Sequence, residues 1–147
     1  MSKSFQINAY FHYLIHSGNR HSVHSPFVYA LLENAIAPQQ NFAKSEEIEL
    51  LRKQLYLDKR IIQVEDFGVG SKKLGEIRQV NQLAKIVGRS KKSGQLLQRL
   101  CTYFNPKVII ELGTSIGLGT AYLSSASSNA KVITIEGCKE TAKLAFE

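Results

Sequence analysis

The stretch Val108-Ile-Ile-Glu-Leu-Gly-Thr-Ser-Ile-Gly-Leu-Gly-Thr120 decides the fold. Its apolar, β-branched start is typical of a buried strand. An acid, Glu111, and a glycine-rich loop follow, and the residues from Ala121 onward favour a helix. This order is typical of a nucleotide-binding turn, because glycines let the backbone approach a ligand and the N–H groups of a helix start face it.

A second strand pattern, Lys131-Val-Ile-Thr-Ile135, ends at Glu136, 25 residues after Glu111. A nucleotide site of this layout requires an acid there, because its carboxylate accepts the ribose hydroxyls. The two patterns predict an α/β fold with the first two parallel strands of a Rossmann-like sheet. We expect the residues before this unit to position and cover it.

An earlier loop, Glu65-Asp-Phe-Gly-Val-Gly-Ser71, also follows an apolar run, Ile61-Ile-Gln-Val64. The stretch where its second strand and acid would be needed, Leu83–Ser90, is basic and contains no acid. The later loop is therefore the predicted ligand site. The role of residues 66–71 stays open between lining the pocket and capping a turn with Asx-type bonds.

The spacing of the glycines separates the classes of cofactor. A dinucleotide fingerprint starting at Gly113 would need glycine where this chain has Ser115 and Leu118. A phosphate-binding loop of the Walker type would end in Gly-Lys-Ser/Thr, which is absent from the stretch. Neither a pyrophosphate loop nor a Walker loop fits the sequence.

The segment Glu111-Leu-Gly-Thr-Ser-Ile-Gly117 resembles motif I of class I S-adenosylmethionine-dependent methyltransferases. Its Glu-x-Gly-Thr-x-x-Gly form is similar to the small-molecule O-methyltransferase branch that includes catechol and caffeoyl-CoA enzymes. Lys92-Ser-Gly-Gln-Leu-Leu97 resembles a helix that precedes motif I in that branch. The N-terminal His-Ser-Val-His-Ser-Pro-Phe-Val pattern from His21 resembles an uncharacterised Bacteroidetes-type group. Ser115 departs from the commonest motif, which has glycine there.

The resemblance implies S-adenosyl-L-methionine as cofactor and methyl transfer to a small-molecule oxygen acceptor. Glu111 would orient the loop or contact the methionine amine, and Glu136 would bind the ribose hydroxyls. Gly94, on the preceding helix, would border the methyl-donor end. The implied cofactor-binding residues are Gly94, Glu111, Gly113, Thr114, Ser115, Gly117, Glu136, Gly137 and Cys138.

Helical spacing of apolar residues and capping signals predict mostly helical structure before the glycine loop. The expected helices cover residues 4–17, 26–36, 45–55, 74–87 and 91–104, and residues 61–64 form an expected strand. We expect a helical extension over 1–60, a connecting strand, loop and helix over 61–89, and an incomplete cofactor-binding domain over 90–147.

The positive charge is uneven along the chain. Residues 61–105 carry eight Lys/Arg against three acids, whereas residues 106–147 carry four of each. The basic segment over 72–99 has two interpretations. It either recruits RNA or an acidic substrate, or it forms a basic face that is exposed to solvent and has no partner. No run is long enough for a membrane span, and two cysteines without metal spacing indicate a cytoplasmic protein.

The last residues, 141–147, have a helical composition without a C-cap signal, which predicts a truncated chain. We therefore expect the catalytic half of the enzyme to be missing, and we assign no catalytic residue. His12 and His16 have a possible metal spacing, but no third ligand is evident and no metal site is predicted. His21 and His24 are interpreted as caps or surface residues. The sequence does not indicate the oligomeric state.

Three other functions remain open at this stage. One is an NAD-binding Rossmann module, and another is a methyltransferase that acts on RNA through the basic segment. The third is a non-catalytic helical interaction domain with a vestigial site.

Overall fold

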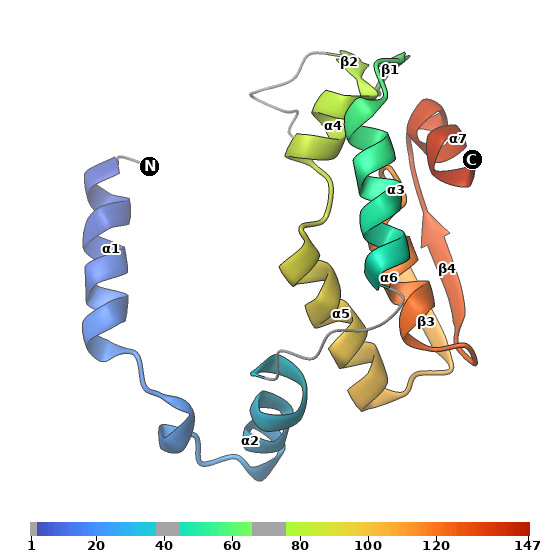
Figure 1. The fold of residues 1–147 in the computed structure, drawn as a ribbon. Coiled ribbons are helices and arrows are strands. Elements are labelled where there is room, and N and C mark those ends of the chain that lie inside the picture. The colour runs from blue at the N-terminus through green and yellow to red at the C-terminus, as the bar shows by residue number, and fades with distance from the viewer. Residues whose placement is uncertain (1–2, 38–44, 66–75) are drawn as a thin grey trace. The chain divides into compact units, whose positions relative to one another are not determined.

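The computed structural model describes residues 3–37, 45–65 and 76–147 (Figure 1). The fold is mixed α/β with helices predominating, and it has two compact units, Met1–Pro38 and Gln39–Glu147. The sequence predicted an extension as far as residue 60. The helix α3 (Ser45–Leu57) contacts α4 (Val80–Ile86) and α6 (Leu118–Ala126) of the second unit, so the division falls earlier in the chain.

The first unit contains α1 (Lys3–His16), a 3₁₀ turn (Arg20–Ser22) and α2 (Pro26–Leu31), which continues as a π-helical turn (Leu32–Ile36). The predicted start of α2 is confirmed, because the Ser25 hydroxyl accepts a hydrogen bond from the Val28 amide at 3.4 Å. No residue of α1 is buried.

The second unit is built around α6, which contacts α3, α5 (Lys91–Phe104) and the strand β4 (Lys131–Ile135). Tyr122 of α6 is completely buried, and Leu118 is 1% exposed. Around α6 the hydrophobic core takes in Ile48, Leu55, Val64, Val80, Leu83, Ala84, Ile116, Cys138 and Leu144. The helix that follows the glycine loop is therefore held from several sides.

A buried polar cluster joins α3 to α6. The Tyr122 hydroxyl donates to Glu49 Oε1 at 2.6 Å, and Arg52 donates to the Tyr122 oxygen at 3.4 Å and to the Glu49 carboxylate at 3.2 Å. Burial, followed by the bond to Glu49, raises the pKa of the Tyr122 phenol above its ordinary value. The cluster fixes the position of the Tyr122 ring.

A second polar chain connects three helices. The Ser45 hydroxyl donates to Gln98 Oε1 at 3.0 Å, and Gln98 Nε2 donates to the Ser125 hydroxyl at 2.6 Å. Gln98 is fully buried, so both ends of its amide have the partners that burial requires. The Ser45 side chain, at the start of α3, therefore bonds to α5.

The strands β1 (Ile61–Gln63) and β2 (Ile77–Gln79) form an antiparallel pair in which Ile62 lies opposite Arg78. The strand predicted over 61–64 is confirmed. The helix predicted over 74–87 is wrong in its first part, because β2 pairs with β1 and α4 (Val80–Ile86) begins only after it. Backbone pairing with a distant strand overrides the local helical spacing there.

The strands β3 (Val108–Leu112) and β4 (Lys131–Ile135) are parallel, with Ile110 opposite Ile133, as predicted. The side chains alternate along both strands, and one face of the pair is half-buried. The other face carries exposed apolar side chains, which we call the exposed sheet face: Val108, Ile110, Leu112, Ile133 and Ile135.

The ends of α5 follow the predicted signals. The Ser90 hydroxyl caps its start by accepting from the Ser93 amide at 3.2 Å, and Asn105 ends it in the left-handed conformation with φ of 43°. The helix α7 (Lys139–Phe146) follows β4. Among the described residues, no helix combines the length and apolar character needed to cross a membrane.

Candidate functional site

The glycine loop joins β3 to α6 through three residues in the left-handed region. Gly113, Ser115 and Gly117 have φ of 89°, 50° and 79°. These are the three alternating positions of the resemblance, and Ser115 adopts there the conformation that a glycine takes more readily. A non-glycine residue in this region costs on the order of 1 kcal/mol or more, so surrounding contacts must hold the loop.

Backbone hydrogen bonds supply part of this support. The Gly113 amide donates to the Ile135 carbonyl at 2.8 Å, and the Gly117 amide donates to the Thr114 carbonyl at 3.0 Å. A Cβ placed on Gly113 would meet no heavy atom within 4 Å. The loop therefore borders open space at its first glycine, which is where a ligand could approach the backbone.

Glu136 connects the end of β4 to the loop. Its Oε2 accepts from the Ser115 amide at 2.6 Å, and its Oε1 accepts from the Cys138 amide at 3.0 Å. A carboxylate offers about four lone-pair sites, so each oxygen keeps the capacity to accept another bond. The bond to Ser115 also accounts for part of the support that its left-handed conformation requires.

Glu111 lies beside the first turn of α6. Its Oε2 accepts from the hydroxyls of Thr120 and Thr134, the second at 2.9 Å. Its Oε1 lies 2.5 Å from the position that a Cβ on Gly119 would take, so a side chain at this position would displace the Glu111 carboxylate. The carboxylate is favoured in this position because the N-terminus of a helix carries positive partial charge.

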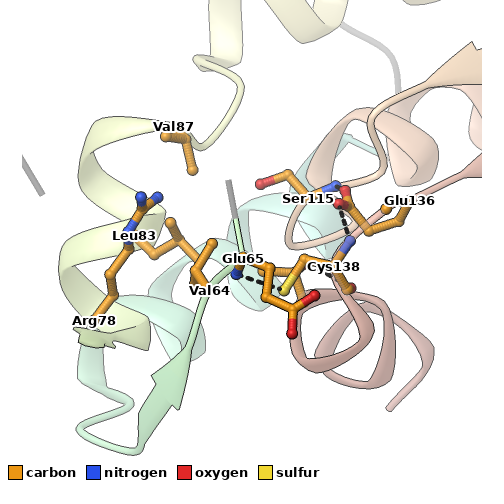
Figure 2. A pocket seen from close by; sticks show the side chains of 10 residues that line it. Val64, Glu65, Arg78, Leu83, Val87, Ser115, Glu136 and Cys138 are labelled. Atoms are coloured by element: carbon orange, nitrogen blue, oxygen red, sulfur yellow. Dashed lines mark hydrogen bonds between the residues drawn. The ribbon is translucent and has the colours of Figure 1, made fainter. Parts of the chain in front are cut away.

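A cavity of about 320 Å³ lies in front of the loop (Figure 2). One wall comes from β1, β2 and α4, and the other from the loop, the end of β4 and α7. The residues that line it are Val64, Glu65, Arg78, Leu83, Val87, Ser115, Glu136, Gly137, Cys138 and Thr141. The cavity thus joins four of the predicted cofactor-binding residues to a wall from the preceding segment.

A smaller hollow of about 40 Å³ adjoins the same loop and includes Glu111, Gly113, Thr114 and Ser115. Val87 and Ser115 line both this hollow and the larger cavity. The predicted residues other than Gly94 and Gly117 therefore lie around two hollows with shared walls.

A third cavity of about 510 Å³ lies between α6 and α7. Thr114, Gly117 and Glu136 contribute to it, but most of its lining side chains are apolar. Glu136 is thus shared between this cavity and the one in front of the loop.

Cys138 is a free thiol that is only 2% exposed. Burial raises its pKa, but hydrogen bonds from the Thr141 hydroxyl and from neighbouring backbone N–H groups outweigh burial and lower the pKa below its ordinary value. The Glu65 amide donates to the sulfur at 3.4 Å, which ties the two walls of the cavity together (Figure 2).

Gly94 lies apart from the loop residues in the packing between α5 and α6. A Cβ at this position would stand 2.2 Å from Cε2 of the Tyr122 ring. Gly94 lines none of the three cavities described above. Helix packing accounts for this glycine without a ligand.

The histidines show no ligand arrangement. His12 and His16 stack with ring centroids 4.0 Å apart, and His16 Nδ1 lies 2.9 Å from the His12 carbonyl oxygen. His21 and His24 are exposed. Within the described ranges, no group of three or more His, Cys, Asp or Glu side chains is placed to hold a metal ion. Residues 66–71 lie outside the described residues.

The sequence interpretation missed the wall formed by Val64, Glu65, Arg78, Leu83 and Val87. Arg78 was assigned to a predicted helix, whereas β2 holds it in the cavity wall with 6% of its surface exposed. The sequence around it, Glu76-Ile-Arg-Gln-Val80, is mixed polar and apolar and gives no signal that would distinguish Arg78 from a surface residue.

Comparisons of the chain with protein-family models, with curated proteins and with solved structures found no match. The functional assignment therefore depends on the geometry of the loop and its cavities.

Proposed function

We propose that this chain binds S-adenosyl-L-methionine at the glycine loop and belongs to a Rossmann-like methyltransferase that acts on a small-molecule oxygen acceptor. The observation that carries the proposal is the pair of carboxylates on the loop. Glu111 lies at the start of α6, and Glu136 accepts from the Ser115 amide. The Glu111 carboxylate lies beside the N-terminus of α6, where a phosphate group would otherwise be favoured.

Charge distinguishes this cofactor from a dinucleotide. A pyrophosphate next to Glu111 and Glu136 would meet two negative charges in a partly desolvated site, which is unfavourable. S-adenosylmethionine carries a sulfonium and an ammonium group, both positive. A site with two carboxylates and no lysine in the loop favours such a cation over a polyphosphate.

The size of the cavity and the hydrogen-bonding groups around it also suit S-adenosylmethionine. A cavity of about 320 Å³ is within the range of small-molecule sites, and it adjoins the open space beside Gly113. Each oxygen of Glu136 has a remaining lone pair for a ribose hydroxyl. Gly137 and Cys138 would lie beside the adenine, whereas Glu111, Gly113 and Thr114 would lie toward the methionine part.

The cofactor, when bound, supplies an activated methyl group for displacement by a nucleophilic oxygen. This chain contributes binding and orientation. Glu136 would hold the ribose, the Gly113 backbone would allow close approach, and the walls from β1, β2 and α4 would exclude water. We assign no catalytic base, and we propose weak or no turnover for this chain alone. Two free thiols agree with the proposed cytoplasmic location.

Isothermal titration with S-adenosylmethionine and with NAD tests the proposal. We expect binding of the first and none of the second. Glu136→Gln keeps the size of the side chain but places an amide group against the Ser115 amide, so we expect roughly tenfold weaker binding. Glu140→Gln is the matched control, because Glu140 lies outside the cavity and pairs with Lys143. Equal affinity of the Glu136 variant and the control, or tighter binding of NAD, would contradict the proposal.

A second candidate acceptor is RNA. Arg89 lines the small hollow, and Lys85, Lys91 and Lys92 are exposed on the same stretch of chain. RNA binding through these residues would weaken steeply as salt increases. Fluorescence anisotropy with a single-stranded RNA at 50 and 200 mM salt measures this dependence, and no binding at the lower salt would exclude RNA as the acceptor.

A further inference from the structure

The small hollow beside the glycine loop contains side chains of both charges. Arg89 and Glu111 line it together with the backbone of Gly113. Arg89 is exposed, whereas Glu111 is half-buried. Within the described part of the chain, no ion pair joins these two side chains. The hollow therefore presents a cation and an anion that do not neutralise each other by direct contact.

The backbone on both sides of Arg89 is held in place. A Cβ added to Gly88 would stand 2.2 Å from the Ala84 carbonyl oxygen and 3.2 Å from Cδ1 of Leu118, so Gly88 lies tightly between α4 and the start of α6. On the other side, the Ser90 hydroxyl caps α5 by accepting from a first-turn amide at 3.2 Å. Arg89 thus lies between two fixed neighbours, and the freedom that remains is in its side chain.

The volume of the hollow limits the kind of group that it can hold. The hollow measures about 40 Å³. One water molecule needs roughly 10–15 Å³ of such space, so the hollow accommodates a group of a few heavy atoms and not a nucleoside. The cavity of about 320 Å³ in front of the loop shares Val87 and Ser115 with it and has room for the larger part of a ligand. A ligand that uses both spaces would place a small charged end in the hollow.

An end group with both charges matches the two side chains. An α-amino acid carries an ammonium and a carboxylate on the same carbon atom. Glu111 suits the ammonium, because its Oε2 bonds to the hydroxyls of Thr120 and Thr134 and the carboxylate keeps further lone pairs. The Arg89 guanidinium suits the carboxylate through two parallel charge-assisted hydrogen bonds. S-adenosylmethionine has such an end, whereas NAD does not.

We propose that Arg89 binds the carboxylate of S-adenosylmethionine and so makes the site selective for a cofactor with an intact amino-acid end. The inference rests on the proposed function, and it adds a specificity residue from outside the glycine loop. Solvent and salt screen the charge of an exposed arginine, so its contribution comes mainly from the paired hydrogen bonds. A lysine would keep the charge but not this paired geometry.

Isothermal titration with two cofactors tests the role of Arg89. The probes are S-adenosylmethionine and decarboxylated S-adenosylmethionine, which lacks only the carboxylate. We expect Arg89→Gln to weaken binding of the first by roughly tenfold and to change binding of the second by less than about twofold. The measured quantity is the ratio of the two affinities, because a general loss of packing affects both cofactors and leaves this ratio unchanged.

Two further variants complete the design. Lys91→Gln is the matched control, because it removes the same charge from an exposed side chain nearby that lines none of the three cavities described above. We expect it to change the ratio by less than about twofold. Arg89→Lys keeps the charge, and we expect a ratio between those of the unmodified chain and Arg89→Gln. Circular dichroism of every variant checks the fold.

Three outcomes would overturn the inference. No effect of Arg89→Gln on either cofactor would exclude contact between Arg89 and the carboxylate. Equal weakening of both cofactors would make Arg89 a structural residue. An equal change of the ratio in Lys91→Gln would attribute the preference to the overall positive charge of this stretch. The proposed function survives these three outcomes, because each includes binding of S-adenosylmethionine, whereas failure of the unmodified chain to bind either cofactor would remove both proposals.

Discussion

Gly94→Ala should destabilise the second unit, although alanine normally stabilises a helix interior by roughly 1 kcal/mol relative to glycine. The added Cβ would stand 2.2, 2.3 and 2.5 Å from three atoms of the Tyr122 ring. Ordinary contact begins at 3.4 Å, so the ring would have to move by about 1.2 Å. Tyr122 is completely buried and bonded to Glu49 and Arg52, so such a shift would strain both bonds.

The magnitude follows from these opposing effects. Overpacking typically costs 1–3 kcal/mol, and a weakened buried hydrogen bond adds about 1 kcal/mol. After subtracting the helix gain of about 1 kcal/mol, we expect a net loss of roughly 1–3 kcal/mol. Urea unfolding followed by circular dichroism measures this change as a lower midpoint at constant slope.

Two controls isolate the cause. Lys91→Ala lies on the exposed start of the same helix, and we expect a change within about 0.5 kcal/mol. In a Tyr122→Leu background the ring is absent, so Gly94→Ala should no longer be destabilising. A stabilising effect of Gly94→Ala in the unmodified chain would refute the packing argument. Unchanged stability with a large loss of cofactor affinity would instead indicate that Gly94 contributes to cofactor binding.

Three further predictions concern the loop and the surface. Gly113→Ala places a side chain at φ of 89° and in the open space beside the loop. We expect the free energy of unfolding in urea to fall by about 1 kcal/mol, and S-adenosylmethionine to bind more weakly. Unaltered binding would argue against close approach of a ligand at Gly113. Ser115→Gly removes the cost of a left-handed serine, so we expect the free energy of unfolding to stay the same or rise, and a fall of more than about 1 kcal/mol would contradict that cost. The hydrogen bond from Arg60 holds the pKa of Asp58 below its ordinary value of 3.8, so the stability that it adds is complete above about pH 5 and is lost as pH falls through the folded-state pKa. Asp58→Asn should therefore flatten the acid side of the midpoint-against-pH curve, and a curve that coincides with that of the unmodified chain would exclude this pair as a source of the pH dependence.

The parts of the fold with local signals were predictable. The strand at Val108 follows from three β-branched residues after a proline, and the end of α5 follows from Asn105 and Pro106. The parallel pairing of β3 and β4 was also predictable from the sequence, because a short helix between two apolar runs leaves few other topologies. These features depend on residues close together in the chain.

The features that were missed depend on contacts between distant residues. Ile77 has helical spacing with the residues after it, but β2 forms because β1 offers a backbone partner. Arg78 enters the cavity wall as a consequence. Gly94 matched a family motif, yet its surroundings are set by Tyr122, 28 residues later. Local spacing contains no information about these pairings.

The exposed sheet face has a practical consequence for every measurement proposed above. Side chains such as Leu112, which is 80% exposed, favour contact with any other apolar surface in solution. Self-association through such a face would make apparent stability and apparent affinity depend on the concentration of the protein. Titrations and unfolding curves should therefore be collected over at least a tenfold range of concentration, so that intrinsic constants are obtained by extrapolation to dilute solution.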